Sequence, residues 1–218
     1  MSGSIDMNQM LTAIQETVYM TFYSLAFAVL FGLAIGVLLY CTQTGSLFEN
    51  KIVNRISDMV VNILRAIPFI ILLILCLPLA TFLTGTMLGA TAALPSLILA
   101  ATPFYARMCV IAFTEVDKGT IEASKSMGAS NWQIITKVLL PESMPALVSG
   151  ITVTGITLVS YTAMAGTIGA GGLGNLAYLY GFARRNNAVL YTSTFIVVCI
   201  VFAIQWIGDF AVKHIDKR

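Results

Sequence analysis

The stretch Thr17–Tyr40 reads TVYMTFYSLAFAVLFGLAIGVLLY and contains no charged residue. A helix needs about 20 mostly apolar residues to cross the roughly 30 Å of hydrocarbon in a bilayer, and this stretch is long enough. The rest of the chain has a similar composition, since 58% of its 218 residues are hydrophobic and only 10% are charged. A soluble domain contains about 25% charged residues. The sequence therefore predicts a polytopic membrane protein.

Apolar segments along the chain predict an all-α fold of five transmembrane helices, at about 17–40, 60–83, 89–113, 144–167 and 188–210. With the polar loop 114–142, these helices form one domain over residues 17–210. A short outer segment, 1–16, precedes the domain, and a tail, 211–218, follows it. Four prolines interrupt the second and third helices and are expected to kink them: Pro68, Pro78, Pro95 and Pro103.

The positive charges predict the orientation of the bundle. If the helices alternate in direction, only Arg184 and Arg185 of the twelve Lys and Arg residues fall on one side, which leaves ten on the other. Lys and Arg accumulate on the cytoplasmic side of membrane proteins. We therefore expect a multi-pass protein of the cell inner membrane with its N-terminus outside. The polar loop and the C-terminus are then cytoplasmic.

The predicted helices carry no ionisable residue near the middle of the membrane. Asp58, Glu115, Asp117 and Asp209 lie near predicted helix ends, and Glu16 precedes the first helix. Transporters driven by protons or sodium usually place a carboxylate or a His at membrane depth. Backbone carbonyls can also bind sodium, so an ion-coupled secondary transporter remains the alternative function. No metal site, catalytic residue or enzymatic activity is predicted, because the one His lies in the tail and the four Cys are scattered singly.

Two of the predicted helices have a distinctive face. Ala28, Gly32 and Gly36 recur every four residues in the first helix, which lets another helix approach closely. One face of the fourth helix carries hydroxyls and ends in a flexible methionine: Ser149, Val153, Thr157, Ser160 and Met164. With the adjacent Tyr161, its outer part (Thr157, Ser160 and Met164) is a candidate translocation pathway and gate. Alternatively, the hydroxyls bond to the carbonyls of their own helix.

A glycine-rich segment, Gly166-Thr-Ile-Gly-Ala-Gly-Gly-Leu-Gly174, follows the fourth helix. Gly169, Gly171 and Gly174 have the spacing of a dinucleotide-binding fingerprint, but that motif needs a preceding strand and an acidic residue about twenty residues later. Here a membrane helix precedes it, and the next acidic residue is Asp209. We therefore expect a compact outer turn. The phosphate-binding sequence GxxxxGK[ST] is missing from the chain as well, so no cofactor is expected to bind to it.

The polar loop is predicted to form two short helices. The first runs from Asp117 to Met127, and Gly128 ends it in a left-handed conformation. The second begins with a capping box made by Ser130 and Gln133. Its predicted apolar side consists of Trp132, Ile135, Val138 and Leu139, and Pro141 is expected to stop the helix. Such an apolar surface must be buried against the bundle or against a partner.

The spacing within this loop resembles the coupling loop of binding-protein-dependent ABC importer permeases. Their pattern is Glu-Ala-Ala, three residues, Gly, nine residues and Ile-x-Leu-Pro, which this chain matches with Glu122, Ala123, Ser124, Gly128, Val138, Leu140 and Pro141. Ser124 stands for the second Ala, and Val138 stands for Ile. Three further segments are similar to the permeases of methionine importers: 62–73, 103–107 and 169–174. The resemblance covers about residues 15–210.

What the resemblance implies is the type-1 permease fold and the role of a non-catalytic subunit in an ATP-driven amino-acid importer. Two permease copies would form the pathway, and two cytoplasmic ATPase subunits that use ATP and Mg would dock at the coupling loop. An external binding protein or lipoprotein would deliver the substrate, for which methionine is expected. Besides the matched residues, Met127 is expected to contact the ATPase. Glu122 would either form an ion pair with it or orient the loop. No nucleic-acid partner is expected, and the lipid bilayer surrounds the assembly.

Overall fold

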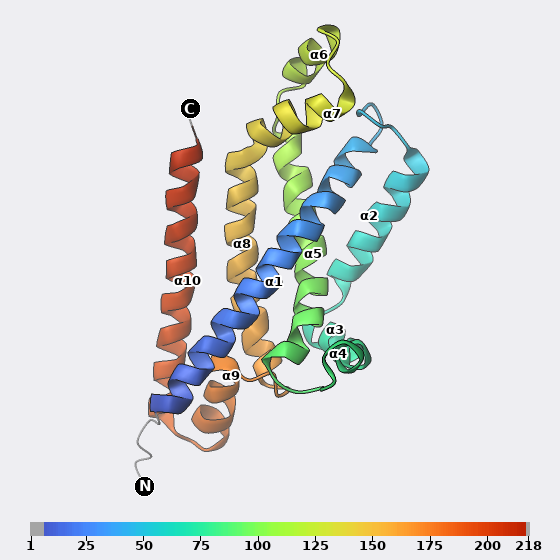
Figure 1. Cartoon of the computed structure of the whole chain (residues 1–218). Helices are drawn as coiled ribbons and strands as arrows, with labels where there is room; N and C mark the ends of the chain where they lie inside the picture. Colours follow the sequence, from blue (N-terminus) through green and yellow to red (C-terminus); the bar gives the residue numbers. More distant parts are fainter. Residues whose placement is uncertain (1–6, 217–218) are drawn as a thin grey trace.

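The computed structural model describes residues 7–216 and consists of helices joined by short connections (Figure 1). The elements are α1 (Met7–Cys41), α2 (Lys51–Ala66), α3 (Phe69–Leu75), α4 (Leu77–Thr84), α5 (Ala90–Thr114), α6 (Lys118–Ser126), α7 (Asn131–Ile134), the π-helical turn η1 (Ile135–Leu139), α8 (Leu140–Gly166), α9 (Gly172–Leu176), the π-helical turn η2 (Ala177–Ala183) and α10 (Asn187–Ile215). No strand occurs among these residues, so the all-α prediction is confirmed.

Four helical segments are long and apolar enough to cross a membrane, and a bent pair of helices forms a fifth candidate. The four are 7–41, 90–114, 131–166 and 187–215, and the bent pair joins α2 to α3. In Figure 1 the start of α1 and the end of α10 lie at opposite ends of the bundle. The helices α6 and α7 lie at the same end as the last turn of α10. This arrangement fits an odd number of crossings.

The centre of the bundle is formed by α1, α5 and α8. The first helix crosses the others diagonally (Figure 1) and approaches α5 closely at its glycines. A β-carbon on Gly32 would lie 2.9 Å from the carbonyl oxygen of Thr102, and one on Gly36 would lie 2.5 Å from the β-carbon of Cys109. Ala28 is completely buried in the same row. The close approach predicted from the spacing of these small residues is therefore confirmed.

The second predicted helix, 60–83, is wrong as a single element. The chain instead forms α2, α3 and α4, and α2 meets α3 at an angle of 103°. Ile67 has an extended backbone (φ −75°, ψ 123°), as expected for a residue before a proline, because the ring of Pro68 disfavours a helical conformation there. Pro78 lies in the first turn of α4, where no donor is lost. By contrast, Pro95 and Pro103 lie inside α5, which runs unbroken from Ala90 to Thr114.

The boundaries of two other predicted segments also differ. The first helix begins by Met7, so residues 7–16 of the predicted outer segment are helical, and its first six residues lie outside the described part of the chain. Pro141 does not stop a helix, because residues 131–166 form one continuous span. A π-helical turn precedes the proline, and the N–H of Leu140 donates to the carbonyl of Ile135, five residues back. This wider turn accommodates the proline without breaking the helix.

Candidate coupling surface and translocation pathway

The short helix α6 is capped at both ends by residues of its own sequence. The carboxylate of Asp117 accepts a hydrogen bond from the N–H of Thr120 at 3.0 Å. At the other end, Gly128 adopts φ +82°, and the N–H of Ala129 donates to the carbonyl of Ser124 at 3.1 Å. This bond and the left-handed glycine form a Schellman motif. The predicted left-handed turn at Gly128 is therefore confirmed.

The start of α7 is fixed by the capping box expected from the sequence. The N–H of Gln133 donates to the hydroxyl of Ser130 at 3.3 Å, and the N–H of Ser130 donates to the Gln133 side chain at 2.8 Å. In addition, the amide of Asn131 donates to the carbonyl of Leu47 in the connection between α1 and α2, at 2.8 Å. The helix pair α6–α7 is thus a rigid unit that is anchored to the bundle.

Some of the residues predicted to couple the chain to the ATPase face away from the bundle. Met127 is 81% exposed, and Glu122, Ala123, Gly128 and Pro141 are exposed as well. The carboxylate of Glu122 makes no hydrogen bond or ion pair within residues 7–216.

The remaining members of the set lie closer to the bundle. Ser124 is buried and bonds back to the carbonyl of Thr120, and Val138 and Leu140 are half-buried. The predicted apolar side of the second short helix is partly wrong. Trp132 is 68% exposed, whereas Ile134, Ile135 and Leu139 pack against the bundle. The wider spacing of the π-helical turn explains this difference, because it rotates residues 135–139 relative to a regular helix. The exposed apolar surface of the loop therefore centres on Met127 and Trp132.

The predicted pathway face of α8 is open in the single chain. Ser149, Val153, Ser160 and Met164 are exposed, and Thr157 is half-buried. The hydroxyls of Ser149 and Thr157 donate to carbonyls four residues back in the same helix, at 3.0 and 2.8 Å. The alternative reading of these two hydroxyls is therefore correct in the present conformation. Their oxygens still line the surface and can accept further hydrogen bonds.

Tyr161 lies at the edge of this face and contacts another element. Its ring stacks on that of Phe69, the first residue of α3, with centroids 4.4 Å apart and planes at 7°. The stack holds the C-terminal half of α8 against the bend between α2 and α3. Tyr161 is therefore a packing residue in this conformation, beside the exposed Ser160.

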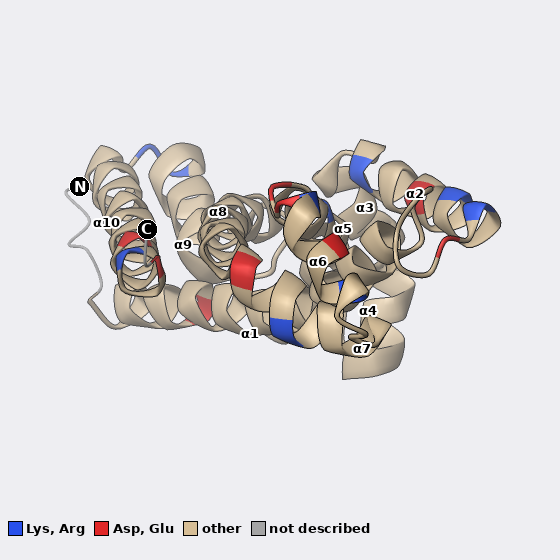
Figure 2. Cartoon of the chain, turned by 90° about the horizontal axis from the view of Figure 1, so that it is seen from above, with Lys and Arg blue, Asp and Glu red and all other residues tan. Residues whose placement is uncertain are grey.

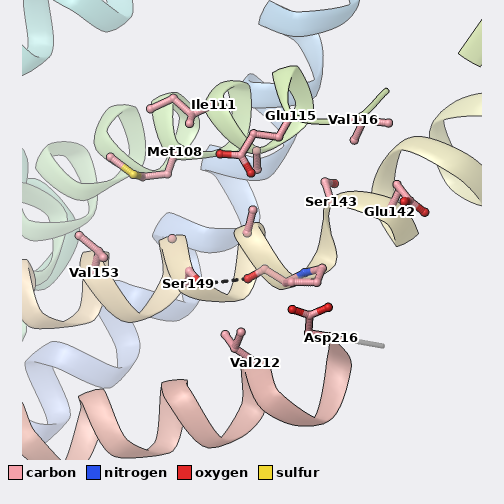
Figure 3. Close-up of a pocket in the computed structure, with 14 residues that line it drawn as sticks. Met108, Ile111, Glu115, Val116, Glu142, Ser143, Ser149, Val153, Val212 and Asp216 are labelled. Atoms are coloured by element: carbon pink, nitrogen blue, oxygen red, sulfur yellow. Dashed lines mark hydrogen bonds between the residues drawn. The ribbon is translucent and has the colours of Figure 1, made fainter. Parts of the chain in front are cut away.

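A cavity of about 450 Å³ opens between α5, α8 and the end of α10. Figure 3 shows Ser149 and Val153 on its α8 wall, opposite Met108 and Ile111 of α5. Three carboxylates lie nearer its mouth: Glu115, Glu142 and Asp216. Within residues 7–216 no cluster of His, Cys, Asp and Glu is arranged to hold a metal ion. The cavity joins the first turns of the pathway face to the end of the molecule that carries α6 and α7.

Two hydrogen bonds clamp α1 to the start of α9, at the end of the molecule away from α6 and α7, and the sequence analysis did not predict them. The carboxylate of Glu16 accepts a hydrogen bond from the N–H of Gly172 at 2.6 Å, and the hydroxyl of Thr17 accepts one from the N–H of Leu173 at 2.9 Å. Both N–H groups open the helical segment 172–183. Gly169 and Gly171 have positive φ and form the compact turn expected there. The position of Glu16 before a predicted span gave no sign of a partner 156 residues away.

A second group missed by the sequence interpretation joins α2 to α5. A guanidinium nitrogen of Arg107 lies 2.8 Å from a carboxylate oxygen of Asp58 and donates to the amide oxygen of Asn62 at 2.9 Å. The amide nitrogen of Asn62 in turn donates to Asp58 at 2.8 Å. Asp58, which the sequence interpretation placed near a helix end, thus pairs with Arg107 within the facing surfaces of two helices.

Comparison with known proteins identifies the class. Residues 28–218 match the family model of the binding-protein-dependent transport system inner membrane component. This match covers most of the chain, which therefore belongs to that family. Among its relatives is the methionine import system permease protein MetP of Bacillus subtilis, 54% identical over 215 residues (99% of this chain and 97% of MetP). The probable D-methionine transport system permease protein MetI of Pasteurella multocida is 47% identical over 203 residues (93% of this chain and 94% of MetI).

Solved structures agree with this assignment. The chain superposes on a chain of the MetNI methionine ABC transporter, solved in inward-facing conformations, with a TM-score of 0.95 and 44% identity. The match covers 97% of this chain and 98% of the other. An amino acid ABC transporter crystallised with histidines matches with a TM-score of 0.78 at 17% identity, which shows a shared fold.

Proposed function

We propose that this chain is the membrane-spanning permease subunit of an ATP-driven methionine importer. The observation that carries the proposal is the superposition on MetNI over nearly the whole of both chains, at 44% identity. The names of MetP and MetI, which describe methionine transport systems, agree with it. The ion-coupled alternative is disfavoured by the same superposition, because MetNI is an ABC transporter.

Two copies of the chain form the pathway, and two ATPase subunits dock on their coupling loops. The exposed faces support this assembly. Met127 and Trp132 form an apolar surface at the tip of the molecule, where a soluble subunit can cover it. Glu122 has no partner within the described residues and is available for an ion pair with that subunit. ATP and Mg bind to the ATPase, and an external binding protein or lipoprotein delivers the substrate at the opposite end.

The continuity of residues 131–166 supplies the mechanical link. Because α7, η1 and α8 form one span, a displacement of the coupling loop moves α8 directly. The loop itself resists deformation through the Asp117 cap, the Gly128 turn and the Ser130–Gln133 box. ATP-driven closure of the two ATPase subunits therefore switches the paired α8 helices between two rigid-body arrangements. Thr157, Ser160 and Met164 line the pathway between the copies, with Met164 at its apolar constriction.

The test is transport by purified components in proteoliposomes. The complete system contains the permease, its ATPase, the delivery protein and ATP, and it is expected to concentrate methionine. The matched control contains an ATPase whose phosphate-binding lysine is replaced, which should abolish accumulation without changing assembly. Uphill accumulation by the permease alone, driven by a proton or sodium gradient, would contradict the proposal.

A further inference from the structure

Helix α2 has a polar face that runs along its whole length. Successive turns place Lys51, Asn54, Arg55, Asp58, Asn62 and Arg65 within an arc of about 100°, at 100° per residue. The apolar residues on the other side have a different environment. Ile56, Val60, Val61 and Leu64 line a groove that α2 forms with α1, α4 and α5. In Figure 2 the charged residues of α2 stand out as blue and red segments, whereas α1 is tan over most of its length.

Three residues of the polar face, Asn54, Asp58 and Asn62, have partners on neighbouring helices. The amide of Asn54 donates to the carbonyl of Leu39 at 2.8 Å, at the end of α1. Asp58 and Asn62 share Arg107, as described above. Arg65 comes next, and its guanidinium makes no hydrogen bond, ion pair or ring contact within residues 7–216. The side chain is exposed.

The contacts between helices place Arg65 near the middle of the bundle. Asp58 pairs with Arg107, and α2 runs antiparallel to α5 (Figure 1), so Arg65, seven residues further on, is level with about residue 100. That residue lies near the midpoint of α5, which spans Ala90–Thr114. Along α2, Arg65 is about 20 Å from the first residue, at 1.5 Å per residue. The sequence interpretation counted this arginine only among the ten positive residues of one side, and the structure places it in the last turn of α2.

The same level of α8 carries the outer hydroxyls of the pathway face. A β-carbon on Gly150 would lie 3.1 Å from the β-carbon of Met108, which sets the register of α8 against α5. Because α5 and α8 run in opposite directions (Figure 1), residue 158, eight residues after Gly150, is level with residue 100, eight residues before Met108. Thr157 is therefore level with Arg65, and Ser160 lies less than one turn beyond it. The bend after α2 strengthens this placement, because Phe69, four residues after Arg65, stacks on Tyr161.

An arginine at this depth needs water or an anionic partner. Transfer of its charge to the bilayer centre is unfavourable, so such residues face a water-filled cavity or a partner group. The side of α5 next to the Asp58–Arg107 pair continues through Met108 and Ile111 to Ser149 and Val153 of α8, with which they share a cavity. At the end of α2, the stack of Phe69 on Tyr161 brings the chain that follows Arg65 to the edge of the pathway face.

We propose that Arg65 binds the carboxylate of the amino-acid substrate as it passes through the pathway. This inference rests on the proposed function and adds a substrate-binding residue to it. A guanidinium offers a planar pair of N–H donors that matches a carboxylate, and a low-dielectric surrounding strengthens this contact. The apolar side chain of the substrate is then left to Met164 and the aromatic pair Phe69–Tyr161. The contact is transient, because neighbouring water competes for the carboxylate.

The test compares three variants of the reconstituted importer: Arg65→Gln, Arg65→Lys and the matched control Arg55→Gln. Arg55 lies on the same polar face, also makes no ion pair within the described residues, and is near the start of α2. For each variant, methionine uptake and the ATP hydrolysed per methionine are measured. Arg65→Gln should lower uptake at least about tenfold and raise the ATP:methionine ratio correspondingly, as expected for loss of a charge-assisted hydrogen bond.

The other variants make the test specific. Arg65→Lys keeps the charge but loses the planar pair of donors, so the ratio should rise only about two- to fivefold. Arg55→Gln should change the ATP:methionine ratio by less than about twofold, which is the range of ordinary surface substitutions. If Arg65→Gln does not assemble with the ATPase, the ATP:methionine ratio of Arg65→Lys is the deciding measurement. A ratio equal to that of wild type would then overturn the inference.

Two further outcomes would contradict the inference. Uptake by Arg65→Gln within about twofold of wild type would exclude the contact. Uptake and ATP hydrolysis that fall in the same proportion would show that Arg65 only stabilises the end of α2, where a cation also favours the helix dipole. A wild-type complex that fails to transport methionine would overturn the proposed function and this inference together, whereas an active wild type with an active Arg65→Gln overturns this inference alone.

Discussion

Gly128 shows how one residue sets the shape of the coupling loop. Its φ of +82° belongs to the left-handed region, and a β-carbon there would meet nothing within 4 Å. A substitution at this position therefore acts only through backbone strain and leaves packing unchanged. The strain is smaller for Asn than for a β-branched residue, because Asn adopts the left-handed region more readily.

We expect Gly128→Val to uncouple transport, because it strains the turn between α6 and α7 by about 1–2 kcal/mol or more. Uptake per ATP hydrolysed is the measurement. The matched control is Gly128→Asn, which should retain most of the coupling. ATP-driven uptake by Gly128→Val equal to that of wild type would contradict a role for the turn in force transmission.

Met164 is the residue at which the proposed gate can be tested. Its side chain is 41% exposed on the pathway face. Met164→Ala should open the apolar constriction and raise ATP hydrolysis in the absence of substrate, or cause a substrate leak from loaded liposomes. Met144→Ala, which truncates another exposed methionine of α8 nearer the coupling loop, is the control. Identical basal ATPase and leak rates in Met164→Ala and wild type would argue against a gate at this position.

Residue-scale features were predictable where the signal is local. The Ser130–Gln133 box and the Gly128 turn need only neighbours within the same few residues, and both are present. Glu16 and Arg65 were misjudged for the opposite reason. The partner of Glu16 lies 156 residues away, and the depth of Arg65 depends on the pairing of Asp58 with Arg107. Neither relationship leaves a periodic signal in the sequence.

At the scale of single helices, the contact between α1 and α5 depends on the absence of side chains. Gly36→Leu should destabilise the protein, because its β-carbon would already overlap Cys109 and overpacking typically costs about 1–3 kcal/mol or more. The matched control is Ala34→Leu, which adds a leucine two residues away on an exposed part of α1. The midpoint of thermal unfolding in detergent should fall for the first variant and stay near wild type for the second. Equal midpoints would contradict the packing argument.

The clamp between α1 and the glycine turn gives a second prediction for these helices. Glu16→Ala removes the acceptor for the N–H of Gly172, and a hydrogen bond to a charged group contributes about 1.5–3 kcal/mol. The unfolding midpoint should therefore fall by at least about 3 °C. Gln15→Ala, next to it and exposed, is the control and should have little effect. A stable Glu16→Ala protein would show that Thr17 alone holds the turn.

The break between α2 and α3 marks the limit of prediction for helices. An apolar count over 60–83 fits one straight helix and equally the observed α2, α3 and α4, because it records composition and not direction. Pro68 was noted as an interruption, but a proline can kink, end or begin a helix. Pro95 and Pro103 illustrate this ambiguity, since α5 passes through both. The outcome depends on the elements packed around each proline.

For the whole molecule, the positive charges predict which end faces the cytoplasm. Cysteines introduced by Met127→Cys and Arg184→Cys report on the two ends, because both positions are exposed and lie at opposite ends of the bundle. In intact right-side-out cells, a membrane-impermeant maleimide should label position 184 and spare position 127. In inverted vesicles the pattern should reverse. Equal labelling in cells and inverted vesicles would contradict the orientation, and the chain without added cysteines gives the background.

The class of fold was predictable because the apolar segments are long and the spacing of the coupling loop is distinctive. Both signals depend on many residues of one type or on a fixed local order. The arrangement of polar groups inside the bundle was not predictable in the same way. Charged side chains were counted by side only, whereas Asp58 and Arg107 pair within the facing surfaces of α2 and α5. Counting charges gives a direction across the membrane but no depth.

The Glu16–Gly172 bond also constrains how the protein can be made. The ribosome releases α1 first, yet the N–H group that binds Glu16 lies 156 residues later. At about 5–20 residues per second, the interval is roughly 8–30 s. During that time α1 is present without the hydrogen bond from Gly172. Loss of Glu16 should therefore affect synthesis and membrane insertion before it affects the finished transporter. The expected sign is early degradation of newly made chains.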